Sequence, residues 1–136
     1  MYVIYYLYIC FENIVINSIT YKMNKMKSEP YVVVEYYYPK SEHVDDVMKI
    51  LKETSAMIKE QDGALMSMSL KPEKKDGAIA GMSMWESRDK FTAFMKGEHM
   101  EKIMKSGLVD NVKSWTTDIK ANLYTIEQAW HVESHD

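Results

Sequence analysis

The chain has 136 residues, of which 46% are hydrophobic and 27% are charged. This length suits one domain, and the composition is that of an ordinary globular protein. A net charge of −3 argues against general binding to nucleic acid or to an anionic membrane. Cys10 is the one cysteine, so no disulfide framework can form within the chain, and we expect a reducing, cytoplasmic compartment.

Residues 1–28 are predicted to be an N-terminal extension. The apolar run that opens it ends at Glu12, whereas a membrane span needs about 20 apolar residues. It also lacks the basic start and the cleavage site of a signal peptide. Two alternatives stay open: the segment forms two strands that cover a sheet edge or a partner surface, or translation begins at Met23 or Met26.

A central strand and an amphipathic helix are predicted next. The segment from Tyr31 to Tyr38 is β-branched and aromatic and ends at Pro39, and both of its faces are apolar enough to be covered. Ser41 is the expected N-cap of the following helix, and Gly63 is its expected stop. The helical period is carried by Val44, Val47, Met48, Leu51, Ser55 and Ile58.

Two alternating segments, residues 65–71 and 78–85, predict a β-hairpin. Each segment gathers its methionines on one side, and the polar, glycine-ended residues 72–77 join the two. The hairpin is therefore expected to have a methionine face and a second face that carries small residues and Trp85.

A second helical region and a last strand complete the predicted pattern. Ser87 is expected to cap a helix that Gly97 interrupts, and a short helix is expected over residues 98–106. Alternation then predicts a strand within residues 115–126. The buried stripe of the first of these helices contains Phe91, Phe94 and Met95.

This order, β-α-β-β-α-β, predicts an α+β, ferredoxin-like domain over residues 29–127, with an antiparallel sheet whose helices lie on one face. Residues 128–136 are expected to be a tail. The other face of the sheet carries tyrosines and methionines, and a second copy of the chain is its simplest cover. We therefore expect a homodimer through the sheet face.

The segment from Trp85 to Ile103 resembles the antibiotic biosynthesis monooxygenase family of dimeric α+β barrels. The residues that carry the resemblance are Trp85-Glu86-Ser87, Phe91, Gly97 and His99, with Glu60 and Gly63 to Leu65 upstream. The resemblance covers residues 31–126. It implies a dimeric α/β barrel in which each subunit keeps a pocket between sheet and helices.

The resemblance also implies an activity. Some members of the family oxidise phenolic or quinol substrates with O2 and no bound cofactor, because a phenolate is electron-rich enough to reduce oxygen itself. Such a site needs a dry pocket, a proton acceptor and hydrogen bonds to the anion. The leading hypothesis is a cofactor-independent monooxygenase acting on a small phenol or quinol. The alternative is a non-catalytic barrel that binds a small hydrophobic or aromatic ligand or a protein.

Haem degradation is the third hypothesis. Haem-degrading members of the family carry an Asn, a Trp and a ligating His at positions that fall here on Glu35, Phe94 and Met104. All three residues depart from that pattern, which disfavours this activity, although methionine can ligate haem iron.

Glu35 and His99 are the candidate catalytic residues. Burial of Glu35 within its strand would raise its pKa and make it a usable base, unless its face meets the dimer partner. A histidine side chain can act as a base, which makes His99 a candidate, although a helix-start residue that bonds to the backbone is the plainer interpretation. The candidate substrate-binding residues are Trp85, Tyr37, Phe94, Ser83 and Asn122. Because His131 and His135 have no third ligand nearby, no metal site is expected.

Overall fold

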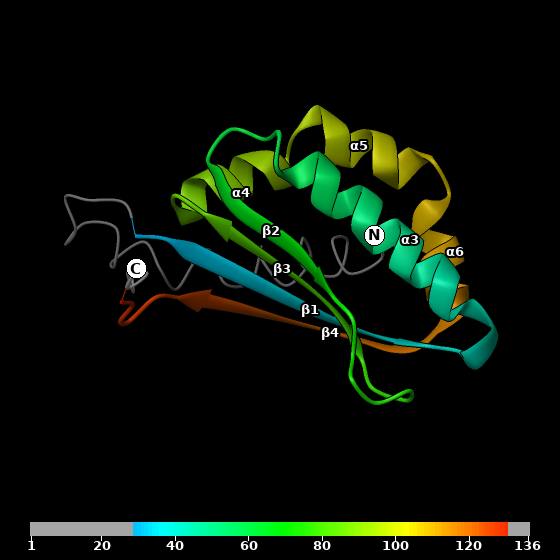
Figure 1. Cartoon of the computed structure of the whole chain (residues 1–136). Coiled ribbons are helices and arrows are strands. Elements are labelled where there is room, and N and C mark those ends of the chain that lie inside the picture. The colour runs from blue at the N-terminus through cyan, green and yellow to red at the C-terminus, as the bar shows by residue number, and fades with distance from the viewer. Residues whose placement is uncertain (1–28, 131–136) are drawn as a thin grey trace.

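The computed structural model describes residues 29–130 and has four strands in one antiparallel sheet, in the order β2-β3-β1-β4 (Figure 1). The strands are β1 (Tyr31–Pro39), β2 (Ala64–Leu70), β3 (Ile79–Trp85) and β4 (Thr116–Thr125). The helices are α3 (Val44–Ile58), α4 (Arg88–Met95), α5 (Glu98–Lys105) and α6 (Leu108–Trp115). The predicted ferredoxin-like arrangement is confirmed. The predicted extension, residues 1–28, lies outside the described part of the chain.

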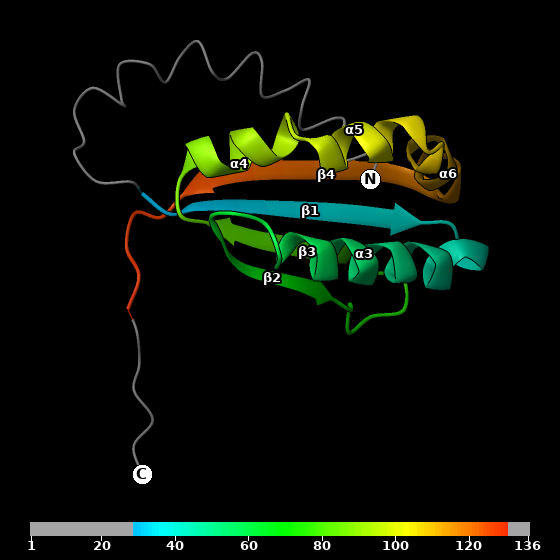
Figure 2. The same cartoon turned by 90° about the horizontal axis from the view of Figure 1, so that it is seen from above.

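The helices lie on one face of the sheet. Figure 2 shows α3 running along β2 and β3, with α4 and α5 in a second row over β1 and β4. The strand β1 has β3 on one side and β4 on the other, so it is central, as predicted. Each row of helices covers one half of the sheet. Side chains on this face of the central strand β1 therefore have helices on both sides of them.

Alternation along the strands decides which side chains enter the core. Tyr31, Val33 and Tyr37 of β1 are buried beneath the helices, and β3 contributes Ile79 and Trp85. The register pairs Tyr31 with Trp85 and Tyr37 with Ile79, which keeps these side chains on one face because successive residues of a strand point to opposite faces. The core therefore lies between the sheet and the helices.

Two local features differ from the predictions. A helix, α6, occupies residues 108–115, where no helix was predicted. Its apolar residues Leu108, Val109, Val112 and Trp115 follow the helical period and lie in or against the core, so the sequence carried a signal that the prediction missed. Ser41 does not cap α3: a 3-10 turn, Ser41–His43, comes first, and Ser41 Oγ donates to Glu42 instead. Ser87 does cap α4, accepting a bond from the Lys90 backbone N–H.

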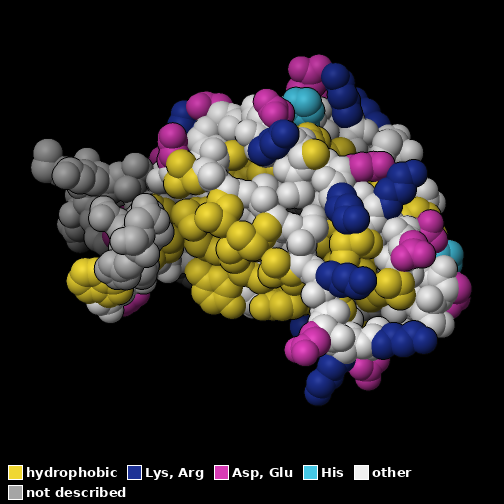
Figure 3. All heavy atoms as spheres, viewed as in Figure 1, with side chains coloured by type: hydrophobic (Ala, Val, Ile, Leu, Met, Phe, Trp, Pro, Cys, Tyr) yellow, Lys and Arg dark blue, Asp and Glu magenta, His cyan; other side chains and the backbone are white. Residues whose placement is uncertain are grey.

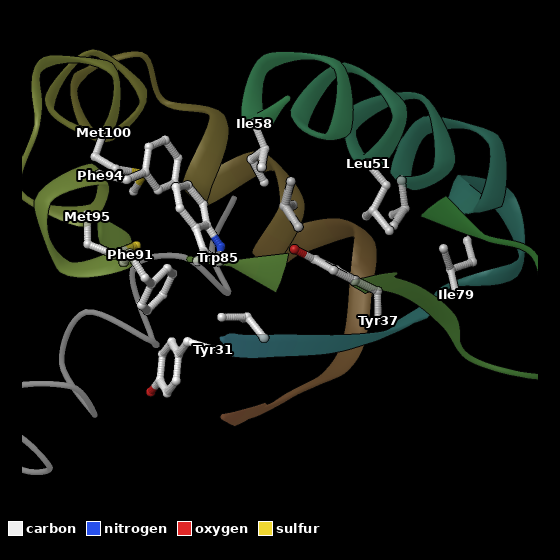
Figure 4. Packing of buried hydrophobic residues seen from close by; sticks show 13 residues of the cluster. Tyr31, Tyr37, Leu51, Ile58, Ile79, Trp85, Phe91, Phe94, Met95 and Met100 are labelled. Carbon is white, nitrogen blue, oxygen red and sulfur yellow. The ribbon is translucent and has the colours of Figure 1, made fainter. Parts of the chain in front are cut away.

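Trp85 is the centre of the aromatic packing. It has no exposed surface, and its ring lies 5.1 Å from that of Phe94 and 5.7 Å from that of Phe91 (Figure 4). Its indole N–H donates to Ser83 Oγ at 3.0 Å, which satisfies the polar atom of an otherwise apolar side chain. Trp85 thus joins the end of β3 to α4.

The face of the sheet that the helices leave open is apolar over three strands. Figure 3 shows hydrophobic side chains gathered over the strands. Because the register places them opposite one another in rows, the apolar residues of this open face are Val32, Val34, Tyr36, Met66, Met68, Leu70, Ala80, Met82 and Met84 of β1 to β3, with Tyr124 of β4. Lys120 and Asn122 of β4 lie on the same face. Within residues 29–130, no helix is both long and apolar enough to cross a membrane.

Replacing Trp85 by alanine should destabilise the fold severely. Loss of a fully buried tryptophan leaves a cavity and costs about 3–5 kcal/mol. Trp130→Ala is the matched control, because Trp130 is 82% exposed and its loss should change the free energy of unfolding by less than about 0.5 kcal/mol. Urea unfolding of the two variants measures the difference, and equal losses would contradict the packing described.

Candidate functional site

A small cavity lies between α3 and the sheet. Its volume is about 20 Å³, which is room for about one water molecule. Side chains from β1, β2, β3 and α3 contribute to the wall, so three strands and a helix position it. The lining residues are Val33, Glu35, Tyr37, Leu51, Thr54, Ser55, Ile58, Ser67, Met68, Gly81, Met82 and Ser83.

Glu35 is the one ionisable carboxyl in this wall. It is partly buried, and the Tyr37 hydroxyl donates to its Oε2 at 2.7 Å. The two residues are two apart on β1, so they share the helix-covered face. Gly81 is the partner of Glu35 on β3. A methyl group at Gly81 would lie 3.4 Å from Leu51 Cδ2 and 4.0 Å from Glu35 Oε2, so the missing side chain leaves room beside the carboxyl.

Burial controls the protonation of this pair. It raises the pKa of the Glu35 carboxyl above its ordinary value, and the hydrogen bond from Tyr37 offsets part of that rise because it favours the charged form. The pKa of the Tyr37 hydroxyl is raised well above its ordinary value, first by burial and then by the neighbouring Glu35. Near neutral pH, Tyr37 therefore stays a hydrogen-bond donor and Glu35 is the group able to accept a proton.

Hydroxyl groups complete the polar part of the cavity. Ser55 Oγ of α3 and Ser67 Oγ of β2 lie 2.8 Å apart and join the helix to the sheet. Thr54 donates to the Ile50 carbonyl, and Ser83 accepts the bond from Trp85. Thr54, Ser55 and Gly81 were not predicted to belong to the site. Thr54 and Ser55 could have been found from the sequence, because they stand on the buried stripe of α3, between Leu51 and Ile58.

His99 lies in a different pocket. It is exposed at the start of α5, and its pocket of about 180 Å³ shares no lining residue with the cavity under α3. That second pocket is lined by Gln61, Asp62, Lys90, Ala93, Phe94, Gly97, Glu98 and His99. Lys90 Nζ lies 2.6 Å from Asp62 Oδ2 across it. The structure does not bring His99 and Glu35 together in one pocket.

The predicted substrate-binding residues divide in the same way. Tyr37 and Ser83 line the cavity with Glu35. Phe94 is 8% exposed and forms part of the His99 pocket, and Trp85 lies between the two in the packed core. Asn122 is exposed and pairs with Val34, which places it on the open face of the sheet, opposite the cavity.

Two of the three positions considered for haem lie apart from the cavity. Glu35 lines the cavity, Phe94 stacks on Trp85, and Met104 is 39% exposed on α5. His131 and His135 lie outside the described residues. Over residues 29–130, no group of three or more His, Cys, Asp or Glu side chains is arranged to hold a metal ion.

The fold and the cavity between sheet and helices define a ferredoxin-like α+β protein with a small internal site. A family model for antibiotic biosynthesis monooxygenases matches residues 30–106. The match spans more than half of the chain, and the chain therefore belongs to the antibiotic biosynthesis monooxygenase family. No protein with a curated description matches it.

Solved structures share the fold at low sequence identity. A proposed antibiotic biosynthesis monooxygenase from Deinococcus radiodurans is 14% identical, with a TM-score of 0.62 over 77% of this chain and 99% of that one. SnoaB from Streptomyces nogalater, described as a cofactor-independent oxygenase, is 15% identical, with a TM-score of 0.57 over 75% and 97%. A heme-degrading protein from Mycobacterium tuberculosis is 14% identical, with a TM-score of 0.57 over 78% and 100%. Identities this low establish the fold alone.

Replacing Glu35 by glutamine should stabilise the protein near neutral pH. Because the pKa of Glu35 is raised in the folded state, its favourable contribution is present at low pH and is lost as the pH rises through that raised pKa. The variant should therefore unfold at a higher temperature than the parent at about pH 7 and at the same temperature at about pH 4. Thermal melts across this range make the measurement.

Glu53→Gln is the control, because Glu53 is exposed on α3 and should show no pH-dependent difference. A Glu35→Gln variant that is no more stable than the parent at any pH would contradict the assigned burial.

Proposed function

We propose that this protein oxidises a small phenol or quinol with O2 and without a bound cofactor, and that Glu35 is the proton acceptor. The observation that supports the proposal is the partly buried carboxyl in the cavity under α3, with its raised pKa and its bond from Tyr37. A carboxylate with a raised pKa is a stronger base than an ordinary one, and efficient base catalysis needs a pKa near the working pH.

The reaction needs only the substrate, oxygen and this base. The phenol proton passes to Glu35, and the phenolate gives one electron to O2, which forms a phenoxyl radical and superoxide. These combine at a ring carbon that carries hydrogen, and the peroxide takes the proton back from Glu35. Loss of water from the hydroperoxide gives the quinone, so one phenol and one O2 become one quinone and one water.

The other lining residues have binding roles in this proposal. Tyr37 keeps its proton and can donate to an oxyanion once Glu35 is protonated. Ser55, Ser67 and Ser83 supply further hydroxyl groups at the wall. An aromatic ring is larger than the cavity, which holds about one water. Substrate entry therefore requires α3, or side chains such as Leu51, to move away from the sheet, and closure would exclude water.

Oxygen uptake with a panel of phenols and quinols tests the proposal. Glu35→Gln should lower kcat by about 100-fold or more, the usual contribution of a positioned base, while its circular dichroism spectrum stays that of the parent. Glu53→Gln is again the control and should leave kcat unchanged, since Glu53 is exposed on the outer side of α3. Equal rates for Glu35→Gln and the parent would remove Glu35 from the mechanism.

His99→Ala tests the second predicted catalytic residue. Because His99 is exposed and lines a separate pocket, we expect the His99→Ala variant to consume oxygen at a rate close to that of the parent. If no substrate in the panel is oxidised, the non-catalytic ligand-binding alternative is favoured. A Soret shift on titration with haemin, the probe for the third hypothesis, would favour haem chemistry instead.

We also propose that a second copy of the chain covers the open face of the sheet. Support comes from the apolar rows on that face, of which Leu70 and Tyr124 are 42% and 49% exposed. Apolar patches of this kind mark association surfaces, and self-complementary two-fold contacts are the commonest kind.

Light scattering should give twice the chain mass of 15.9 kDa for the parent. Val34→Lys, at the middle of the open face, should give the mass of one chain, because a lysine there would have to be buried without a partner. Ala56→Lys places the same side chain on the exposed side of α3 and should keep the doubled mass. A parent that scatters as one chain would contradict the dimer.

A further inference from the structure

The cavity under α3 carries two separate polar groups in a partly apolar wall. Glu35 and Tyr37 of β1 form one of them. The bonded hydroxyls of Ser55 on α3 and Ser67 on β2, here called the serine pair, form the other. The same wall includes Val33, Leu51, Ile58 and Gly81, which offer no polar side-chain atom. A ligand that fits this wall needs an apolar body with polar atoms at two places.

The serine pair has one hydroxyl proton to spare. Each serine hydroxyl can donate one hydrogen bond and accept two, and the contact between the two at 2.8 Å uses one of the two protons. Neither side chain makes a further hydrogen bond within residues 29–130. Ser83, which is paired with Ser67 on β3, already accepts the indole N–H of Trp85. The serine pair can therefore donate to an oxygen atom that enters the cavity.

The sheet register sets the distance between the two polar groups. Glu35 is paired with Gly81 on β3, and Gly81 is paired with Ser69 on β2, two residues along the strand from Ser67. With strands about 4.8 Å apart and residues about 3.4 Å apart along a strand, the Cα atoms of Glu35 and Ser67 lie about 12 Å apart. A benzene ring with oxygen-bearing groups at opposite ends, plus a hydrogen bond of about 2.7 Å at each of them, has a similar length. Such a ring can therefore contact both polar groups at once.

Gly81 provides a place for the ring. It lies on β3, which stands between β1 and β2 in the sheet, and it has no side chain to occupy the space beneath α3. Leu51 fills this space, since its Cδ2 would lie 3.4 Å from a methyl group at Gly81. A rotation of the Leu51 side chain would open an apolar floor over Gly81 while α3 keeps Ser55 in place.

We infer that the serine pair determines which substrate is accepted: a small phenol with a hydrogen-bonding oxygen at the end opposite the hydroxyl that Glu35 deprotonates. The role of Glu35 in this inference rests on the proposed oxidation, but the binding preference does not require the reaction. A site that holds a spare donor discriminates against a ligand that lacks the matching oxygen, because the donor then loses its partner when water is displaced.

Two ligands of matched size test the preference. 4-(Hydroxymethyl)phenol carries a hydroxyl where 4-ethylphenol carries a methyl group, and their phenol groups have similar acidity. NMR titrations in the absence of oxygen give both dissociation constants, so binding is measured apart from any reaction. The parent should bind 4-(hydroxymethyl)phenol about fivefold more tightly, which is the usual effect of one neutral hydrogen bond. The backbone amide resonance of Gly81 should shift with both ligands.

The double variant Ser55→Ala, Ser67→Ala removes both hydroxyls of the pair, so neither is left without its partner and the thermal stability should change little. It should bind the two phenols with nearly equal affinity. Ser69→Ala is the matched control, because Ser69 lies on the same face of β2 but outside the cavity wall, and it should keep the preference of the parent.

Three results would overturn the inference: a parent that binds neither phenol or does not prefer 4-(hydroxymethyl)phenol, a preference that persists in the double variant, or an equal loss of preference in Ser69→Ala. Oxygen uptake with the same two phenols separates this inference from the proposed function. Selective binding without oxygen uptake would contradict the oxidation and support the serine pair. Oxygen uptake with equal binding of both phenols would support the oxidation and contradict the role of the pair.

Discussion

The candidate site depends on one contact, the hydrogen bond from Tyr37 to Glu35 beneath α3. Alternation along β1 places both residues on the face that the helices cover, where the neighbours Val33 and Tyr31 are apolar and buried. A carboxyl in this position is costly unless it is neutral or hydrogen-bonded. Tyr37 supplies a bond, and Gly81 supplies the space. A buried carboxyl lowers the stability of the fold, so a carboxyl that lies next to a cavity is explained better by function than by packing.

The two pockets differ in ways that favour the Glu35 cavity as the place of proton transfer. The cavity with Glu35 is small and lined by hydroxyls, and the larger pocket with His99 is lined by charged groups such as Asp62 and Lys90. Between them the aromatic packing of Trp85 and Phe94 fills the space. A positioned carboxyl with a raised pKa can act as a proton acceptor, and this favours the Glu35 side.

The sequence predicted the fold better than the site. The strand alternation, the methionine hairpin and the break at Gly97 each have a local physical cause, so they could be read without tertiary information. Both faces of β1 are apolar, however, so the sequence could not decide whether Glu35 faces the helices or a partner; only the position of α3 decides this. His99 was predicted to be catalytic from a motif that marks the start of a helix. Such a motif does not indicate which pocket the side chain enters. Asn122 shows the same limit, since alternation along β4 leaves the covered face undetermined until the register is known.

The most direct test of the central claim is the pKa of Glu35 itself, measured by ¹³C NMR of the side-chain carboxyl. Its resonance can be assigned as the one missing from the Glu35→Gln spectrum. The account predicts a pKa above the ordinary glutamate value of about 4.3, and a still higher one in Tyr37→Phe, because loss of the donated bond removes an interaction that favours the charged form. A Glu35 carboxyl that titrates at the ordinary value in both proteins would contradict the account.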